Sequence, residues 1–118
     1  HRIFYRKPNL VYIDAGNGLY TGQVVCGLRK NGRTQSKPVG ALYPDILSDQ
    51  DSFPSELSCA DRAASEPQAI TANLMASNTV ICMLYDLLCV GKLYTKSATF
   101  SSFYISTKAD VIQQKRTA

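Results

Sequence analysis

One short segment combines an acidic residue with glycines in a pattern that suits ligand binding. The apolar run Leu10–Ile13 ends at Asp14, and Asp14-Ala-Gly-Asn-Gly then leads to a second run, which begins at Gly22. Short apolar strands that feed polar glycine loops present ligand sites at the carboxyl edge of α/β sheets. Asp14 could bind a backbone amide or a substrate, and Gly16 and Gly18 would let another backbone approach closely. The segment also fits a tight turn whose Asp and Asn bond their own backbone, so both interpretations stay open.

Cys59 is the second candidate for chemistry. It stands in Ser58-Cys-Ala-Asp-Arg62, ahead of an expected helix. A thiol near a helix start and an arginine can have a lowered pKa, which favours the nucleophilic thiolate. The alternative is an inert, half-buried cysteine. Catalysis of the Cys–His type is not expected, because the only histidine is His1.

The other cysteines carry less chemistry. They are Cys26, Cys82 and Cys89, and no CxxC pair occurs, so no zinc or other metal site is expected. Cys82 and Cys89 fall in an apolar helical pattern, which predicts buried free thiols. Free thiols are typical of a reducing environment, so we expect a cytoplasmic location.

Two strands and a turn are expected to position the glycine segment. The continuous apolar run Leu10–Ile13 is typical of a strand buried on both faces. A second strand is expected over Gly22–Leu28, and Lys30-Asn-Gly-Arg33 has the composition of a turn. Residues 36–57 are rich in proline and aspartate, which indicates an irregular crossover loop.

A long helix follows. Ser65-Glu-Pro-Gln68 fits a capping box at its start, and Gly91 is a plausible C-terminal cap. Mostly apolar residues recur at helical spacing between them: Ile70, Leu74, Ser77, Ile81, Leu84 and Leu88. Further apolar residues widen this surface almost all round, which predicts a central, buried helix. The polar residues Asn73, Asn78 and Asp86 would line a pocket or a subunit seam, or bond neighbouring backbone.

The last segment predicts an antiparallel pair of strands. Phe100, Phe103 and Ile105 alternate imperfectly with serines, and with Val111 they suggest a hairpin that turns around Lys108-Ala-Asp110. The fold class is therefore expected to be α/β, with a mixed sheet, a long buried helix and a terminal antiparallel strand pair. At 118 residues, 1–118 is expected to form a single domain or part of a larger one.

Composition narrows the possible partners. The formal net charge is +4, but the cations are scattered along the sequence, so a nucleic-acid surface is not expected. The first residues have no apolar core of a signal peptide. We expect no segment with the roughly twenty apolar residues of a membrane span, and therefore no membrane association.

Two segments together resemble the C-terminal half of a ThiF/MoeB/E1-like adenylyltransferase domain. Tyr12-Ile-Asp-Ala-Gly-Asn-Gly followed by Thr21-Gly-Gln-Val-Val is similar to the family's strand, glycine loop and GQV strand. Ser58-Cys-Ala-Asp-Arg-Ala, leading into Ala72-Asn-Leu-Met-Ala-Ser, resembles the cysteine-containing turn before the long helix of the dimer core. With Leu42-Tyr-Pro in the crossover, the chain looks most like ThiF-like proteins of bacterial mobile elements, of the PRTRC type.

The resemblance implies ATP-dependent, Mg²⁺-dependent activation of the C-terminal glycine of a ubiquitin-like or sulfur-carrier protein. It implies the C-terminal part of a Rossmann-like E1/ThiF fold and a homodimer. A Gly-Gly tail is thin and extended, and a glycine-lined loop can admit it. Asp14, Gly16, Asn17, Gly18 and Gln23 are then the expected contacts of the tail. Cys59 falls where some members carry a cysteine that captures the activated carboxylate.

The sequence also departs from the family. The glycine-rich nucleotide loop, the ribose-binding acid and the Arg, Lys and Asp set for phosphates and Mg²⁺ are absent from these 118 residues. ATP and Mg²⁺ would therefore be bound mainly by residues outside this chain, which would be a portion of a longer domain. The alternative is a non-catalytic E1-like interaction or scaffold module.

Overall fold

The structure of the protein is a computed structural model, and it describes residues 1–45 and 69–112. Its described part is a mixed α/β fold in which a sheet carries one long helix. The strands are β1 (Leu10–Asn17), β2 (Thr21–Lys30), β3 (Arg33–Ser36), β4 (Thr95–Ser101) and β5 (Ser106–Val111). They follow the order β1-β2-β4-β5, and β3 pairs with the end of β2 that β4 does not reach.

Every described strand pairing is antiparallel. The expectation of a mixed sheet is therefore wrong for the described residues. Three of the four pairings join consecutive strands through short turns, and such turns can connect only antiparallel neighbours. The expected terminal antiparallel pair is confirmed in β4 and β5.

The first hairpin is longer in its strands and shorter in its turn than the sequence suggests. Strand β1 extends through Asn17, so Asp14 to Asn17 belong to the strand and not to a loop. Only Gly18, Leu19 and Tyr20 connect it to β2, and the amide of Gly18 donates to the carbonyl of Thr21 at 2.8 Å. Strand β1 is also only half-buried, with Val11 42% exposed, so burial on both faces is not found.

The second turn matches its prediction. Asn31 and Gly32 have φ values of 53° and 76°, between the end of β2 and the start of β3. Two successive residues at positive φ, as in a type I′ turn, match the right-handed twist of the flanking strands, and Asn-Gly is the sequence that adopts them most readily.

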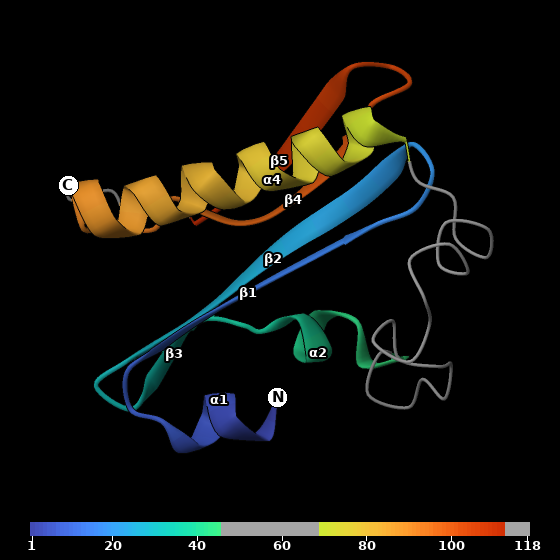
Figure 1. Cartoon of the computed structure of the whole chain (residues 1–118). Coiled ribbons are helices and arrows are strands. Elements are labelled where there is room, and N and C mark those ends of the chain that lie inside the picture. The colour runs from blue at the N-terminus through green and yellow to red at the C-terminus, as the bar shows by residue number, and fades with distance from the viewer. Residues whose placement is uncertain (46–68, 113–118) are drawn as a thin grey trace, which may run out of the picture.

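The long helix lies over one face of the sheet (Figure 1). It consists of α4 (Ile70–Tyr85) and the π-helical turn η3 (Asp86–Val90), and it ends at Gly91 with φ 84°, as its glycine cap predicts. The expected capping box at 65–68 lies outside the described residues.

The helix is not buried all round. Ala72, Ala76 and Met83 are buried against the sheet, whereas Ile70, Leu74 and Leu88 are largely exposed. A single layer of sheet can cover only one side of a helix, so the apolar surface predicted to be central stays open on the far side. The expectation that no segment has membrane-span length is also wrong. Residues Ile70–Val90 form a 21-residue helix that is long and apolar enough to cross a membrane by length and composition.

The core lies between this helix and the sheet. Val24 and Cys26 of β2 and Phe100 of β4 are buried against it. The opposite face is covered at its other end by α1 (Arg2–Arg6) and α2 (Val39–Leu42) (Figure 1). There Phe4, 1% exposed, packs over Gly27 together with Pro38. Helix α2 occupies part of the expected crossover loop 36–57, whose remainder from residue 46 lies outside the described residues.

The terminal hairpin turns earlier than expected. Its turn lies at residues 102–105, where Ile105 has φ 56°, and Lys108 to Asp110 are part of β5. The amide of Ser102 donates to the carbonyl of Tyr20 at 2.7 Å, and the rings of Tyr20 and Phe103 lie 5.7 Å apart. This contact holds the turn beside the β1–β2 turn, which explains why it does not form at Lys108.

Candidate functional site

The residues expected to contact a protein tail lie on two faces of the sheet. Asn17 is paired with Gly22, and Ala15 with Val24, which is buried under α4; side chains at these positions share the helix face. Asp14 and Gly16 alternate with them and therefore face away from α4, together with Gln23. Gly18 lies in the turn. The strand alternation thus separates Asn17 from the other predicted contacts.

On the helix face, Asn17 meets the beginning of α4. Its amide nitrogen Nδ2 donates to Oδ1 of Asn73 at 2.7 Å. The backbone fixes this arrangement, because the amide of Ala69 donates to the carbonyl of Leu19 at 2.9 Å and holds the start of the helix beside the β1–β2 turn. One residue predicted for the tail site and one polar helix residue are therefore brought together.

A groove runs from this pair along β1 and α4. Its volume is about 480 Å³. The lining residues are Ala15, Asn17, Asn73, Ala76, Ser77, Val80 and Ile81. Within the described residues β1 pairs only with β2, so the groove borders an edge strand whose outer side has no described strand beside it. An edge strand and a small-residue helix wall can accept an extended peptide by strand addition.

On the opposite face, the side chain of Gln23 covers Gly16. A methyl group added at Gly16 would lie 3.3 Å from Nε2 of Gln23, tighter than an ordinary contact. Gly16 therefore gives Gln23 room to lie over the backbone of β1. The antiparallel register places Gly16 directly opposite Gln23, and the sequence alone carried no signal for this register.

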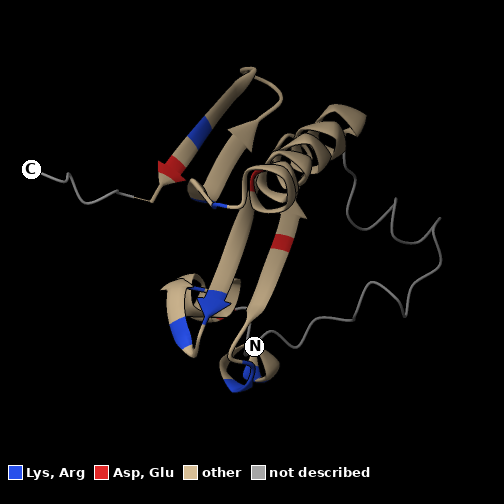
Figure 2. Cartoon of the chain, turned by 90° about the vertical axis from the view of Figure 1, so that its left-hand side faces the viewer, with Lys and Arg blue, Asp and Glu red and all other residues tan. Residues whose placement is uncertain are grey.

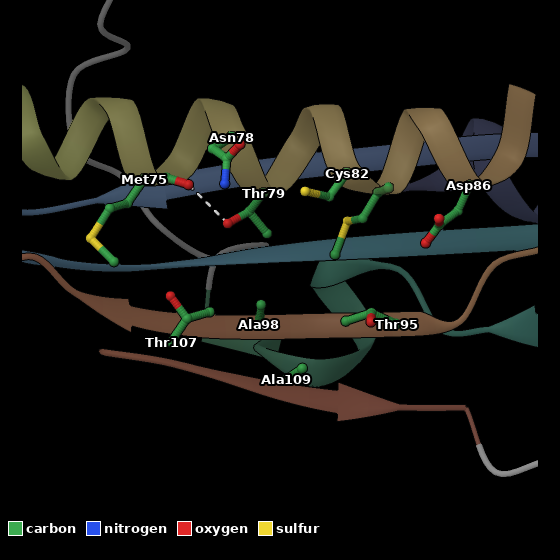
Figure 3. Close-up of a pocket in the computed structure, with 10 residues that line it drawn as sticks. Met75, Asn78, Thr79, Cys82, Asp86, Thr95, Ala98, Thr107 and Ala109 are labelled. Atoms are coloured by element: carbon green, nitrogen blue, oxygen red, sulfur yellow. Dashed lines mark hydrogen bonds between the residues drawn. The ribbon is translucent and has the colours of Figure 1, made fainter. Parts of the chain in front are cut away.

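A second, smaller cavity lies between the helix and β4–β5 (Figure 3). It has a volume of about 290 Å³. Asn78, Cys82 and Asp86 of the helix line it, opposite Thr95, Ala98 and Thr107 of the strands. Of the alternatives for the polar helix residues, pocket lining is found for Asn78 and Asp86 here and for Asn73 in the first groove. Thr79, which sequence reasoning did not single out, donates its hydroxyl to the carbonyl of Met75 at 2.8 Å.

The cysteines differ from expectation. Cys82 and Cys89 are free but exposed, and not buried as predicted; Cys82 lines the open cavity between the helix and β4–β5. Cys26 is buried beneath the helix. Cys59, the candidate acyl acceptor, lies outside the described residues. Residues 1–45 and 69–112 contain no group of three or more His, Cys, Asp or Glu side chains that could hold a metal ion.

Burial makes Cys26 an inert thiol at neutral pH. Removal from water raises the pKa of this thiol from its ordinary value of 9.0 to about 11. The folded protein therefore keeps the proton at pH values at which the unfolded chain loses it.

We expect the Cys26 thiol to destabilise the fold at alkaline pH. Its stabilising contribution is complete below pH 9.0 and is lost as the pH rises toward about 11, at a cost of roughly 3 kcal/mol in the free energy of unfolding. Urea unfolding across this range should show a shallower alkaline decline for Cys26→Ala than for the unmodified chain, whereas Cys82→Ala should not change it. Parallel declines in all three would contradict the assignment.

Comparison of the chain with family models, with curated proteins and with solved structures found no match in any of the three.

Proposed function

We propose that this chain is the C-terminal portion of a ThiF-like, ATP-dependent adenylyltransferase that activates the C-terminal glycine of a ubiquitin-like or sulfur-carrier protein. The groove beside β1 is the observation that carries the proposal. It joins an edge strand to the helix wall at the hydrogen bond between Asn17 and Asn73. The order and spacing of the sequence segments that resemble this family support it independently.

In this proposal the chain binds and orients the protein tail. A tail that ends in two glycines would lie along β1 as an added strand, held by backbone hydrogen bonds. The carboxamides of Asn17 and Asn73 would hold its last residues, while Gly16 and Gln23 shape the strand from the other face. Because glycine has no side chain, the tail can pass between β1 and the wall formed by Ala76 and Val80.

Residues outside this chain would bind ATP and Mg²⁺. Reaction of the tail carboxylate with this ATP would form an acyl adenylate and release pyrophosphate. The residues of this chain include no glycine-rich phosphate loop, so no step at the phosphates is assigned to them. Their task is to hold the carboxylate where the activated phosphate is presented.

The test is ATP–pyrophosphate exchange by the full-length protein that contains this chain, with a Gly-Gly-ending ubiquitin-like protein as substrate. We expect Asn73→Ala to raise the KM for that protein by roughly tenfold, since it removes a side-chain hydrogen bond at the tail. Asn78→Ala is the matched control, because Asn78 lies on the same helix but lines the other cavity. Equal effects of the two variants, or exchange with no partner dependence, would overturn the proposed tail site.

Cys59 is proposed as the acceptor of the activated acyl group: its thiolate would attack the acyl adenylate, form a thioester and displace AMP. We expect Cys59→Ala to leave ATP–pyrophosphate exchange unchanged, because adenylation precedes thiolate attack. The same variant should form no thioester with the partner protein, as judged on sodium dodecyl sulfate gels run without reductant. Cys89→Ala, which removes an exposed helix thiol, should change neither. A thioester that persists in Cys59→Ala removes this role from the residue.

The exposed side of the long helix, from α4 into η3, supports the proposed homodimer. Its residues are spaced alternately four and three apart, as in the seam of a coiled coil. They are Ile70, Leu74, Ser77, Ile81, Leu84 and Leu88, of which Leu88 is 80% exposed. The series reads the same in both directions from its midpoint at position 79, so two copies of the helix can pair antiparallel about a twofold axis.

An interaction module without catalysis is the second candidate. The same exposed stripe favours it, because a scaffold needs a docking surface and no nucleotide site. The exchange assay distinguishes the adenylyltransferase from the scaffold. A full-length protein that dimerises but exchanges no pyrophosphate with any Gly-Gly-ending partner would be a scaffold.

A further inference from the structure

The fold gathers cations that are scattered in the sequence. Figure 2 shows Lys and Arg side by side at the end of the molecule formed by α1 and the β2–β3 hairpin. We call this group the basic end. Its members are Arg2, Arg6, Lys7, Arg29, Lys30 and Arg33. The acidic residues within 1–45 are Asp14, midway along β1, and Asp45, beyond α2.

Hydrogen bonds fasten the two parts of the basic end to each other. Arg29 Nε donates to the carbonyl of Lys7 at 3.0 Å, and its two terminal nitrogens donate to Thr34 Oγ1 and to the carbonyl of Gly32, both at 2.8 Å. The amide of Gly32 also donates to the carbonyl of Pro8 at 3.0 Å. Arg29 therefore connects the hairpin to the end of α1, and the two form one preorganised surface.

The remaining cations of the basic end point outward without described carboxylate partners. The ion pair found among the described residues joins Lys96 to Asp110, on β4 and β5. Arg2, Arg6, Lys7, Lys30 and Arg33 are all exposed. Five like charges held on one rigid end repel one another, and a polyanion that neutralises them relieves this repulsion.

The shape of the hairpin selects among polyanions. From Lys30 to Gln35 every side chain is exposed, and none is a large apolar one. A twisted two-stranded ribbon fits the major groove of B-form DNA, whereas the major groove of A-form RNA is too narrow to admit it. A membrane surface would favour exposed aliphatic side chains on the ribbon. The ring of Tyr5 is 44% exposed but already contacts His1 and Arg29, which leaves less of it to stack on unpaired bases.

We propose that the basic end binds double-stranded DNA. The β2–β3 hairpin enters the major groove, with Lys30 and Arg33 beside its Asn31-Gly32 tip, while Arg2, Arg6 and Lys7 contact the phosphates on the flanking backbone. This function is separate from the tail site, which lies at the opposite end of β1, and it needs neither ATP nor the ubiquitin-like protein.

Fluorescence anisotropy of the full chain with a labelled duplex of about 20 base pairs, two turns of helix, tests the proposal. We expect binding that weakens steeply between about 50 and 200 mM salt. Lys30→Gln with Arg33→Gln should lower the affinity by tenfold or more, because it removes both cations beside the tip of the hairpin. The matched control is Lys96→Gln with Lys108→Gln, which removes the same charge from β4 and β5 and should change the affinity less than about threefold.

Several outcomes would overturn the proposal. Equal weakening by the two double variants would mean that net charge alone is responsible. Affinity for duplex RNA, or for vesicles containing phosphatidylserine, that equals or exceeds the affinity for DNA would exclude the groove-binding mode. Absence of binding at about 50 mM salt would exclude it as well. Thermal unfolding of each variant shows whether its fold is intact, and Arg33→Gln alone serves if the double variant is destabilised.

Discussion

Replacing Gly22 with alanine should lower the free energy of unfolding by about 1–3 kcal/mol. A methyl group at this position would lie 2.5 Å from the carbonyl oxygen of Gly16, 2.6 Å from Cζ of Phe100 and 2.7 Å from Cβ of Asn17. Two of these three neighbours are backbone or directly attached to it, and Phe100 is a buried core residue, 4% exposed. None of them can move away without disturbing the register of β1 and β2 or the packing under α4.

Urea unfolding of Gly22→Ala measures this effect, and Gly18→Ala provides the control. At Gly18 an added methyl group would meet only the carbonyl oxygen of Thr21, at 4.0 Å, an ordinary contact distance. Gly18→Ala should therefore change the free energy of unfolding by less than about 0.5 kcal/mol. If Gly22→Ala proves as stable as Gly18→Ala, the strands do not pack as closely at Gly22 as described.

The Gly22 result also bears on the glycine segment as a functional motif. The packing at Gly22 gives a structural reason for the glycine in Thr21-Gly-Gln-Val-Val that involves no ligand. The case for a tail site therefore does not depend on this glycine. It depends on Asn17, Asn73 and the groove beside them, which is why the exchange assay compares Asn73 with Asn78.

Local sequence signals were sufficient wherever short-range chemistry decides the structure. Asn31-Gly32 specifies a two-residue turn because both residues tolerate positive φ, and Gly91 ends the helix for the same reason. Strand β2 was predictable as a strand because Val24 and Val25 are β-branched and belong to a mostly apolar run that ends at Leu28. The existence of a final hairpin followed from the alternation around Phe100.

Long-range packing decided what the sequence could not show. The glycines of the first hairpin suggested a loop, yet Asp14 to Asn17 remain extended because each pairs with a residue of β2. The final turn formed before Lys108 because Ser102 and Phe103 contact Tyr20, which is distant in sequence. The separation of the predicted tail residues onto two faces depends on the same register, and periodicity alone does not fix a register.

The exposed stripe of α4 should make the chain a dimer, and Leu74→Glu should disrupt it. Leu74 is 61% exposed in the single chain, so its replacement removes little from the core beneath α4. In an antiparallel pair of helices, however, each copy would bury an unpaired carboxylate. We expect the dimer dissociation constant measured by sedimentation equilibrium to rise by about 100-fold or more, equivalent to roughly 3 kcal/mol. The control Asn78→Glu, at a residue that lines the second cavity, should change the dimer dissociation constant by less than about threefold.

Mixing two variants determines the direction of the pairing. The series is symmetric about position 79, so Leu74 of one copy should meet Leu84 of the other. Chains with Leu74→Glu and chains with Leu84→Lys should each be monomeric, yet their equimolar mixture should form a heterodimer with a cross-helix ion pair. Residues 74 and 84 are too far apart on one helix to pair within a chain. Parallel helices would place Leu74 against Leu74, so the mixture would contain no Glu–Lys pair and should form no heterodimer. Sedimentation of the mixture thus distinguishes the antiparallel seam from a parallel one, and persistence of the dimer in both single variants would show that the stripe is not the interface.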